Sequence, residues 1–162
     1  MLNTIKIKLS YIIAYWFGLG LIPFAPGTWA SLATLPIAYF LTKFGNLEIY
    51  IFVTAFITII GIYASQIISI EMKISDPSQI VIDEVSGQLI TLMFIPPEPM
   101  WYLCGFILFR FLDIRKPWPI RWLDTNIKGG TGIMLDDIVA GIFACVLLLL
   151  SHRFYVMLFG GI

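Results

Sequence analysis

The chain has 162 residues, enough for one domain over residues 1–162 and too few for two substantial ones. Its composition argues against a soluble domain, because 59% of the residues are hydrophobic and only 12% are charged, against roughly 25% in soluble proteins. The formal net charge is zero, which argues against a nucleic-acid partner that needs a basic face. An integral membrane protein is the simplest interpretation.

Proline, glycine and charged residues divide the chain into segments of helical length. Helices are predicted at about 4–20, 28–44, 49–70, 78–95, 100–115 and 133–150. Every segment is apolar throughout, whereas strands of a membrane barrel would alternate apolar and polar residues. The predicted fold class is therefore all-α, a multi-helix integral membrane bundle.

The segments between these helices carry most of the helix-breaking residues. The loop at 22–27 holds Pro23, Pro26 and Gly27, which exclude a regular helix there, and Thr28 is a plausible N-cap for the helix that follows. Residues 117–132 are rich in proline, glycine and charge, and are predicted to be irregular.

Acidic residues embedded in apolar helices are costly, so they are candidates for function. They fall in three groups, namely Asp83 with Glu84, Asp113, and Asp136 with Asp137. The alternative for each group is an interfacial helix end, stabilised by the helix dipole or by a neighbouring basic residue. A shared site explains all three groups better than three separate coincidences.

Two of these groups lie on a predicted helical hairpin, about 78–115, which turns near Pro97. Glu84 lies 13 positions before Pro97, and Asp113 lies 16 positions after it. At a rise of ~1.5 Å per residue, the two carboxylates lie ~20 and ~24 Å from the turn, and so at nearly the same depth.

Asp136 and Asp137 are expected near that level, in the first turn or so of the last helix, because the preceding segment is polar. Alternation of the helices brings the 22–28 loop to the same membrane face. Most basic residues also lie on that side, where the positive-inside rule predicts the cytosol. They are Lys6, Lys8, Lys73, Arg110, Arg115, Lys116, Arg121 and Lys128.

Carboxylates gathered in a poorly hydrated place repel one another and require cations. With one histidine and two cysteines in the chain, a metal site would use oxygen ligands and a hard ion such as Mg²⁺. Arg110 and Lys116 flank Asp113 at three-residue spacing, so both could neutralise a bound phosphate. Such a site suits phosphoryl chemistry, which depends on positioning and charge.

Two further positions are candidates for binding phosphate. Gly129–Gly132 is predicted to precede the last helix, where backbone N–H groups and the helix N-terminus could bind an anion, with Gly130 at its centre. Thr28, after Pro26 and Gly27, is the other. For both, a flexible linker or a simple helix cap is an equally good interpretation.

Taken together, four segments resemble the phosphatidylglycerophosphatase A family. They are 23–32, 76–87, 109–120 and 129–141, in the family's order and spacing. The resemblance implies an all-α, Mg²⁺-dependent phosphatase that converts phosphatidylglycerophosphate to phosphatidylglycerol and phosphate at the cytoplasmic side of a bacterial membrane. Ala30 stands where the family often has glycine, and Leu112 where an aromatic residue is common.

The family motifs, carried over, imply roles for individual residues. The implied metal ligands or acid–base groups are Asp83, Glu84, Asp113, Asp136 and Asp137, and the implied phosphate ligands are Arg110 and Lys116. Attack by metal-activated water is preferred, and Asp113 is the alternative nucleophile. The sequence leaves open the number of metal ions and whether the chain forms a homo-oligomer.

Two other classes of function remain to be distinguished. A small transporter or ion pathway would use the carboxylates as a cation relay, although no internal repeat is visible. A non-catalytic membrane subunit would use them only to hold helices together. Release of phosphate from a phospholipid monoester separates the enzyme from both alternatives.

Overall fold

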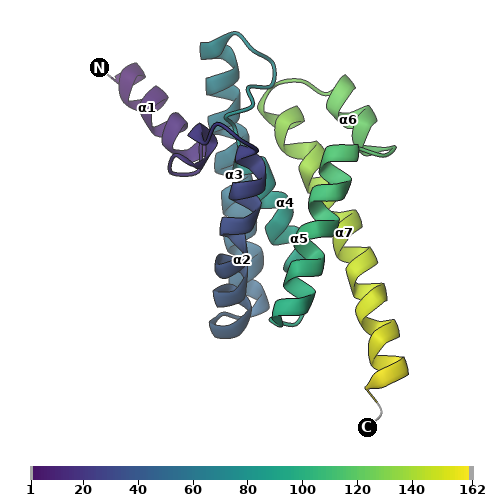
Figure 1. The fold of residues 1–162 in the computed structure, drawn as a ribbon. Coiled ribbons are helices and arrows are strands. Elements are labelled where there is room, and N and C mark those ends of the chain that lie inside the picture. Colours follow the sequence, from purple (N-terminus) through teal and green to yellow (C-terminus); the bar gives the residue numbers. More distant parts are fainter. Residues whose placement is uncertain (1, 161–162) are drawn as a thin grey trace.

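The computed structural model describes residues 2–160, which form helices joined by turns and loops and contain no strand. The helices are α1 (Leu2–Ala14), η1 (Leu19–Leu21, a 3₁₀ turn), α2 (Pro26–Phe44), α3 (Leu47–Met72), α4 (Ile82–Leu92), α5 (Pro99–Arg115), α6 (Ile120–Asn126) and α7 (Gly129–Phe159). Figure 1 shows α2, α3, α5 and α7 running side by side around the short α4. The predicted all-α class is confirmed.

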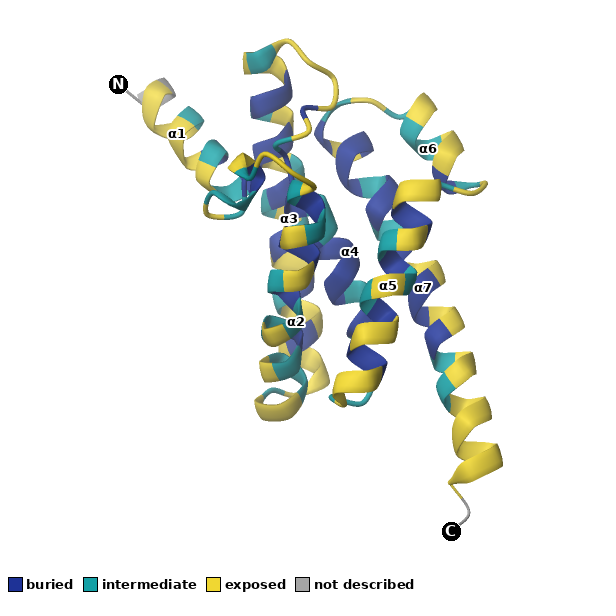
Figure 2. Cartoon of the chain, in the orientation of Figure 1, coloured by how far each residue is buried: buried dark blue, intermediate teal, exposed yellow. Residues whose placement is uncertain are grey.

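Two helices are long and apolar enough to cross a membrane. They are α3 with 26 residues and α7 with 31 residues, whereas ~20 apolar residues suffice for one crossing. Large hydrophobic side chains cover the outside of the bundle, including Phe40, Phe52, Ile107 and Leu147. Figure 2 shows the exposed residues on the outer faces and the buried ones on the faces turned toward α4.

The centre of the bundle is α4, which packs against α2, α3, α5 and α7. Eight of its 11 residues are buried. Its contact with α7 is close because glycine faces glycine: a Cβ at Gly141 would lie 2.4 Å from the carbonyl oxygen of Gly87. With α5 it forms the predicted hairpin, which turns between Leu92 and Pro99.

The first helix is shorter than predicted, since α1 ends at Ala14 rather than near residue 20. Trp16, Phe17 and Gly18 all have positive φ, which a right-handed helix cannot accommodate. The turn they form places the carbonyl oxygen of Ala14 where it accepts a hydrogen bond of 2.9 Å from the N–H of Val81. The chain entering α4 is thereby tied to the end of α1.

Other boundaries also differ from the predictions. Because Ile80 closes a turn onto Pro77, α4 begins at Ile82 rather than at residue 78, and it ends at Leu92 rather than 95. Residues 117–132 are not irregular as predicted: they contain α6, which starts directly after Pro119. Proline is tolerated at the start of a helix, where its missing N–H would have no partner.

The last helix is longer than predicted at both ends. It begins at Gly129 instead of residue 133, so the glycines predicted to precede it form its first turn. It also continues through the polar residues after Leu150 to Phe159. Ser151 donates to the carbonyl oxygen of Leu147 at 2.8 Å, and the ring of His152 meets that of Trp101 edge-on, with 4.9 Å between their centroids.

Candidate active site

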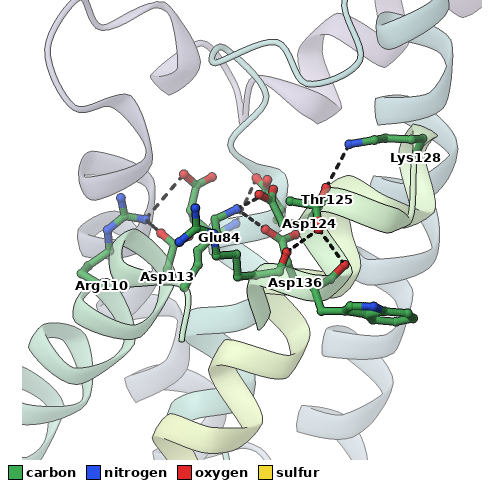
Figure 3. A network of polar contacts seen from close by, with 11 residues as sticks. Glu84, Arg110, Asp113, Asp124, Thr125, Lys128 and Asp136 are labelled. Carbon is green, nitrogen blue, oxygen red and sulfur yellow. Dashed lines mark hydrogen bonds and ion pairs between the residues drawn. The ribbon is translucent and has the colours of Figure 1, made fainter. Parts of the chain in front are cut away.

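All five predicted carboxylates line one cavity of about 260 Å³ at the end of the bundle where α6 lies. The residues come from the first turn of α4, the end of α5 and the third turn of α7. The cavity lining contains Asp83, Glu84, Arg110, Asp113, Lys116, Asp136 and Asp137. Figure 3 shows the cationic and anionic groups interleaved around this cavity.

The tightest group joins α4 to α7. Asp83, Glu84 and Asp137 each offer a carboxylate oxygen, and these oxygens lie within 4.8 Å of one another. The close packing of Gly87 against Gly141 brings the two helices near enough for this contact. Asp137 is only 2% exposed, so the repulsion between these charges is weakly screened by water.

A second group links α5 to α4 through Arg110. Its Nη1 lies 2.6 Å from Oδ2 of Asp113, three residues along α5, and 3.5 Å from Oε1 of Glu84. Gly27, at the start of α2, completes this side: a Cβ there would lie 1.7 Å from Oε1 of Glu84. Only glycine leaves room for the carboxylate and the guanidinium at this position.

A third group is centred on Lys116, which follows the last residue of α5. Its Nζ donates to Asp136 Oδ2 on α7 and, at 2.9 Å, to Asp124 Oδ1 on α6. Burial by itself lowers the pKa of Lys116, but these hydrogen bonds outweigh it and leave the pKa raised. Lys116 therefore carries its charge throughout the physiological range.

Two acidic cavity residues were missed by the sequence interpretation, Asp76 and Asp124, and so was the basic residue Lys128. Asp124 was hidden because its segment was predicted to be irregular and therefore solvated, although a short helix after Pro119 turns it toward Lys116. Asp76 lies in the loop before α4, where loss of solvation near the other carboxylates raises its pKa. The available signal was an acidic residue in a segment that contains proline, since Asp76 precedes Pro77 and Asp124 follows Pro119 by five positions.

The two other predicted phosphate-binding positions do not line this cavity. The N–H of Gly130 donates to Oε1 of Gln66 at 2.7 Å, and a Cβ there would lie 2.1 Å from the carbonyl oxygen of Ile62. Gly130 thus packs α7 against α3 and has its N–H occupied. Thr28 is not the N-cap of α2, which is Ala25, and it lines a separate groove between α2 and α5.

The position of Asp136 and Asp137 along α7 also differs from the prediction. They lie in the third turn, not the first, because the helix starts four residues earlier than expected. Both aspartates nevertheless lie at the predicted depth. The earlier start adds about one helical turn, which runs beside α6 before Asp136 is reached. Both side chains lie at the level of Lys116 and Glu84, in the cavity.

The carboxylate group fits a hard divalent cation. Oε2 of Glu84, Oδ1 of Asp136 and Oδ2 of Asp137 are buried and have no hydrogen-bond partner among the described residues. Seven carboxylates line the cavity, against three basic side chains, Arg110, Lys116 and Lys128. Buried carboxylate oxygens in excess of their donors suit a hard divalent cation such as Mg²⁺, which binds through carboxylate, water and phosphate oxygens.

The fold and the site together define a class: an all-α membrane protein with a buried acidic centre flanked by basic side chains, suited to phosphoryl chemistry. The sequence profile of the family described as Phosphatidylglycerophosphatase A matches residues 12–152. The chain belongs to this family, and it is a phosphatase.

Two relatives carry the family name. The chain is 42% identical over 153 residues to Phosphatidylglycerophosphatase A of Escherichia coli (strain K12), covering 91% of this chain and 88% of the relative. It is 41% identical over 137 residues to the protein of that name from Haemophilus influenzae, covering 84% of each.

A third relative has a different name. The protein from Bacteroides thetaiotaomicron is 35% identical over 153 residues, which cover 89% of this chain and 94% of the relative, and it is provisionally named a phosphatidylinositol-3-phosphatase. All three names refer to a phosphomonoester on a lipid. No solved structure matches the chain significantly.

Proposed function

We propose that this chain hydrolyses phosphatidylglycerophosphate to phosphatidylglycerol and phosphate, with Mg²⁺ held by its buried carboxylates. The observation that carries the proposal is the meeting of Asp83, Glu84 and Asp137 within 4.8 Å, with Arg110 beside them. The names of the two relatives above 40% identity support the choice of substrate.

Asp83, Glu84 and Asp137 would hold the metal ion, with Asp113 and Asp136 at its flanks. When bound, Mg²⁺ supplies neutralisation of charge and polarisation of the phosphoryl group. The three oxygens lie within 4.8 Å of one another, close enough to bind one ion together. One or two ions remain compatible with the number of carboxylates.

The basic side chains position the phosphate. Arg110 and Lys116 face the cavity from one end of α5 and are both held by carboxylates. They donate hydrogen bonds to the phosphoryl oxygens and neutralise the charge that develops as the ester bond breaks. The cavity of about 260 Å³ suits a phosphate with part of its alcohol.

We favour attack by water over attack by an aspartate. Asp113 is engaged by Arg110 at 2.6 Å, which lowers its nucleophilicity and fixes its orientation. Asp136 and Asp137 each keep one buried oxygen without a hydrogen-bond partner among residues 2–160. Either can accept the proton of the attacking water as the new phosphorus–oxygen bond forms.

We propose a multi-pass arrangement in the cytoplasmic membrane of a bacterium, with the cavity facing the cytosol. Lys73, Arg115, Lys116, Arg121 and Lys128 lie near the cavity end of the bundle. Among the described residues, the basic side chains toward the other end are Lys43, in the last turn of α2, and Arg153, near the end of α7. By the positive-inside rule, this asymmetry favours a cytosolic site.

Phosphate release from phosphatidylglycerophosphate in detergent, with Mg²⁺ or with EDTA, tests the proposal. A panel with phosphatidylinositol 3-phosphate, phosphatidic acid and glycerol 3-phosphate tests the substrate. We expect release from phosphatidylglycerophosphate to be fastest and to stop with EDTA. A transporter that uses the carboxylates as a cation relay would release no phosphate from any of them.

A further inference from the structure

A groove between α2 and α5 opens beside the carboxylate cavity on the outer, apolar surface of the bundle. It has a volume of about 340 Å³ and is lined by Thr28 of α2 and by Ile107, Arg110, Phe111 and Arg115 of α5. Ile107 and Phe111 are 57% and 56% exposed. In a membrane these side chains would face lipid.

Arg110 connects the groove to the cavity, because its side chain lines both. A molecule in the groove therefore touches the residue that pairs with Glu84 and Asp113. On the α2 side, Gly27 lets Glu84 and Arg110 pack directly against the helix, since a Cβ there would meet both side chains. The groove and the cavity are therefore neighbours that share Arg110.

The mouth of the groove carries polar groups that are not used elsewhere in the described chain. Arg115 makes no ion pair with residues 2–160, and its guanidinium lies 5.8 Å from the ring centroid of Phe111. The hydroxyl of Thr28 has no hydrogen bond to the same residues. A cation without an ion pair and a free hydroxyl that line the same groove are complementary to an anion.

The groove continues along the same faces of the two helices. A second apolar hollow of about 350 Å³ lies between α2 and α5 and is lined by Leu35, Tyr39 and Leu103. Leu35 follows Thr28 by seven positions, and Arg110 follows Leu103 by seven. Seven residues make about two helical turns, so the two hollows share one face over ~10 Å of each helix.

We propose that this groove, the α2–α5 groove, receives the diacylglycerol part of the lipid substrate and that Arg115 and Thr28 bind its phosphodiester. The inference rests on the proposed function. Phosphatidylglycerophosphate carries two phosphates: the terminal monoester is cleaved, and the diester joins its head group to the diacylglycerol. With the monoester beside Arg110, the diester meets Arg115, and the acyl chains follow the groove toward Leu35 and Leu103.

Arg115 is thus a binding residue that selects lipids with two phosphates. Removing its charge should raise KM for phosphatidylglycerophosphate about tenfold, the scale of one charged hydrogen bond. It should leave kcat within about twofold and leave KM for phosphatidic acid, which has no phosphodiester, unchanged. A role in folding alone would instead change both substrates alike.

The test compares Arg115→Gln with Arg121→Gln, an exposed arginine on α6 that lines neither the cavity nor the groove. We expect the KM ratio of the two lipids to change only in Arg115→Gln. An unchanged ratio, with the wild type active, overturns the assignment of Arg115 while leaving the proposed function intact. A wild type inactive on every lipid would overturn the proposed function itself.

The path of the acyl chains is tested by Ile107→Trp, which fills the groove. Ile59→Trp is the matched control, since Ile59 is 66% exposed on α3, away from the groove. Photo-crosslinking with a phosphatidylglycerophosphate that carries a diazirine on one acyl chain measures binding without turnover. We expect crosslinks on α2 and α5 that Ile107→Trp abolishes and Ile59→Trp retains; crosslinks equally distributed over α3 and α7 would overturn the proposal.

Discussion

Gly27 and Glu84 touch across the helix pair α2 and α4 so closely that a Cβ on Gly27 would lie 1.7 Å from Oε1 of Glu84. The start of α2 therefore rests against the acidic turn that begins α4. Ala25, Pro26 and Gly27 form part of the cavity wall, in agreement with the predicted position of the 22–28 loop at the membrane face of the carboxylates.

This contact predicts the effect of Gly27→Ala. The added methyl group displaces Glu84 and its partner Arg110, so we expect kcat to fall by about 100-fold, the scale of losing one electrostatic stabiliser. Gly18→Ala is the control: Gly18 has φ +100° but open space around it, so that change should lower thermal stability and leave kcat per folded molecule unchanged. Equal kcat values for the two variants would contradict the prediction.

Removing one carboxylate should separate catalysis from folding. Asp137→Asn keeps the shape of a side chain that is 2% exposed and relieves repulsion with Asp83 and Glu84. We expect phosphate release to fall about 100-fold or more and the melting temperature to stay or rise. Glu71→Gln, an exposed change outside the cavity, should alter neither; a melting temperature lowered by Asp137→Asn would favour a purely structural role.

Binding of Mg²⁺ is measurable without turnover. An ion that binds only the folded protein stabilises it by RT ln(1 + [L]/Kd), about 2.7 kcal/mol at 100 times Kd. We expect MgCl₂ to raise the melting temperature of the wild type, and less so that of Asp137→Asn, beyond the effect of NaCl at equal ionic strength. Identical shifts in the two proteins would argue against a site at Asp83, Glu84 and Asp137.

The fold and the grouping of the carboxylates were predictable because both depend on local features of the sequence. Apolar runs of helical length specify the bundle, and the distances of Glu84 and Asp113 from the hairpin turn specify a shared depth. The structure places both side chains in one cavity. Their chemical roles remain predictions.

What the sequence could not predict depends on contacts between distant segments. Thr28 and Gly130 have residue types suited to phosphate, but the packing of α7 on α3 uses the N–H of Gly130, and the angle of α2 turns Thr28 into the groove. Asp124 reaches Lys116 only because α6 forms within a segment rich in helix breakers. No local pattern encodes these orientations.

The ion pair between Lys116 and Asp136 predicts that a second substitution can restore the stability lost in a Lys116 variant but not its activity. Lys116→Met leaves the carboxylate of Asp136, only 4% exposed, without its cation, and should cost about 1–3 kcal/mol of unfolding free energy. Adding Asp136→Asn removes the unpaired charge and should restore most of that loss, while phosphate release stays low in both. Lys8→Met, an exposed change on α1, should be neutral; a double variant as unstable as Lys116→Met would contradict the pairing.

The packing of α4 on α7 should control both stability and metal binding, since the same approach of the helices brings Asp137 to Asp83 and Glu84. A Cβ at Gly141 would lie 2.4 Å from the carbonyl oxygen of Gly87, and this backbone atom cannot move aside alone. Gly141→Ala must therefore separate the helices, at a cost of about 1–3 kcal/mol, and should also weaken the stabilisation by Mg²⁺. Ile142→Ala, at a side chain 48% exposed on the outer face of the same helix, should leave that stabilisation unchanged. Loss of stability in Gly141→Ala with a full response to Mg²⁺ would show that the metal ligands do not depend on this helix contact.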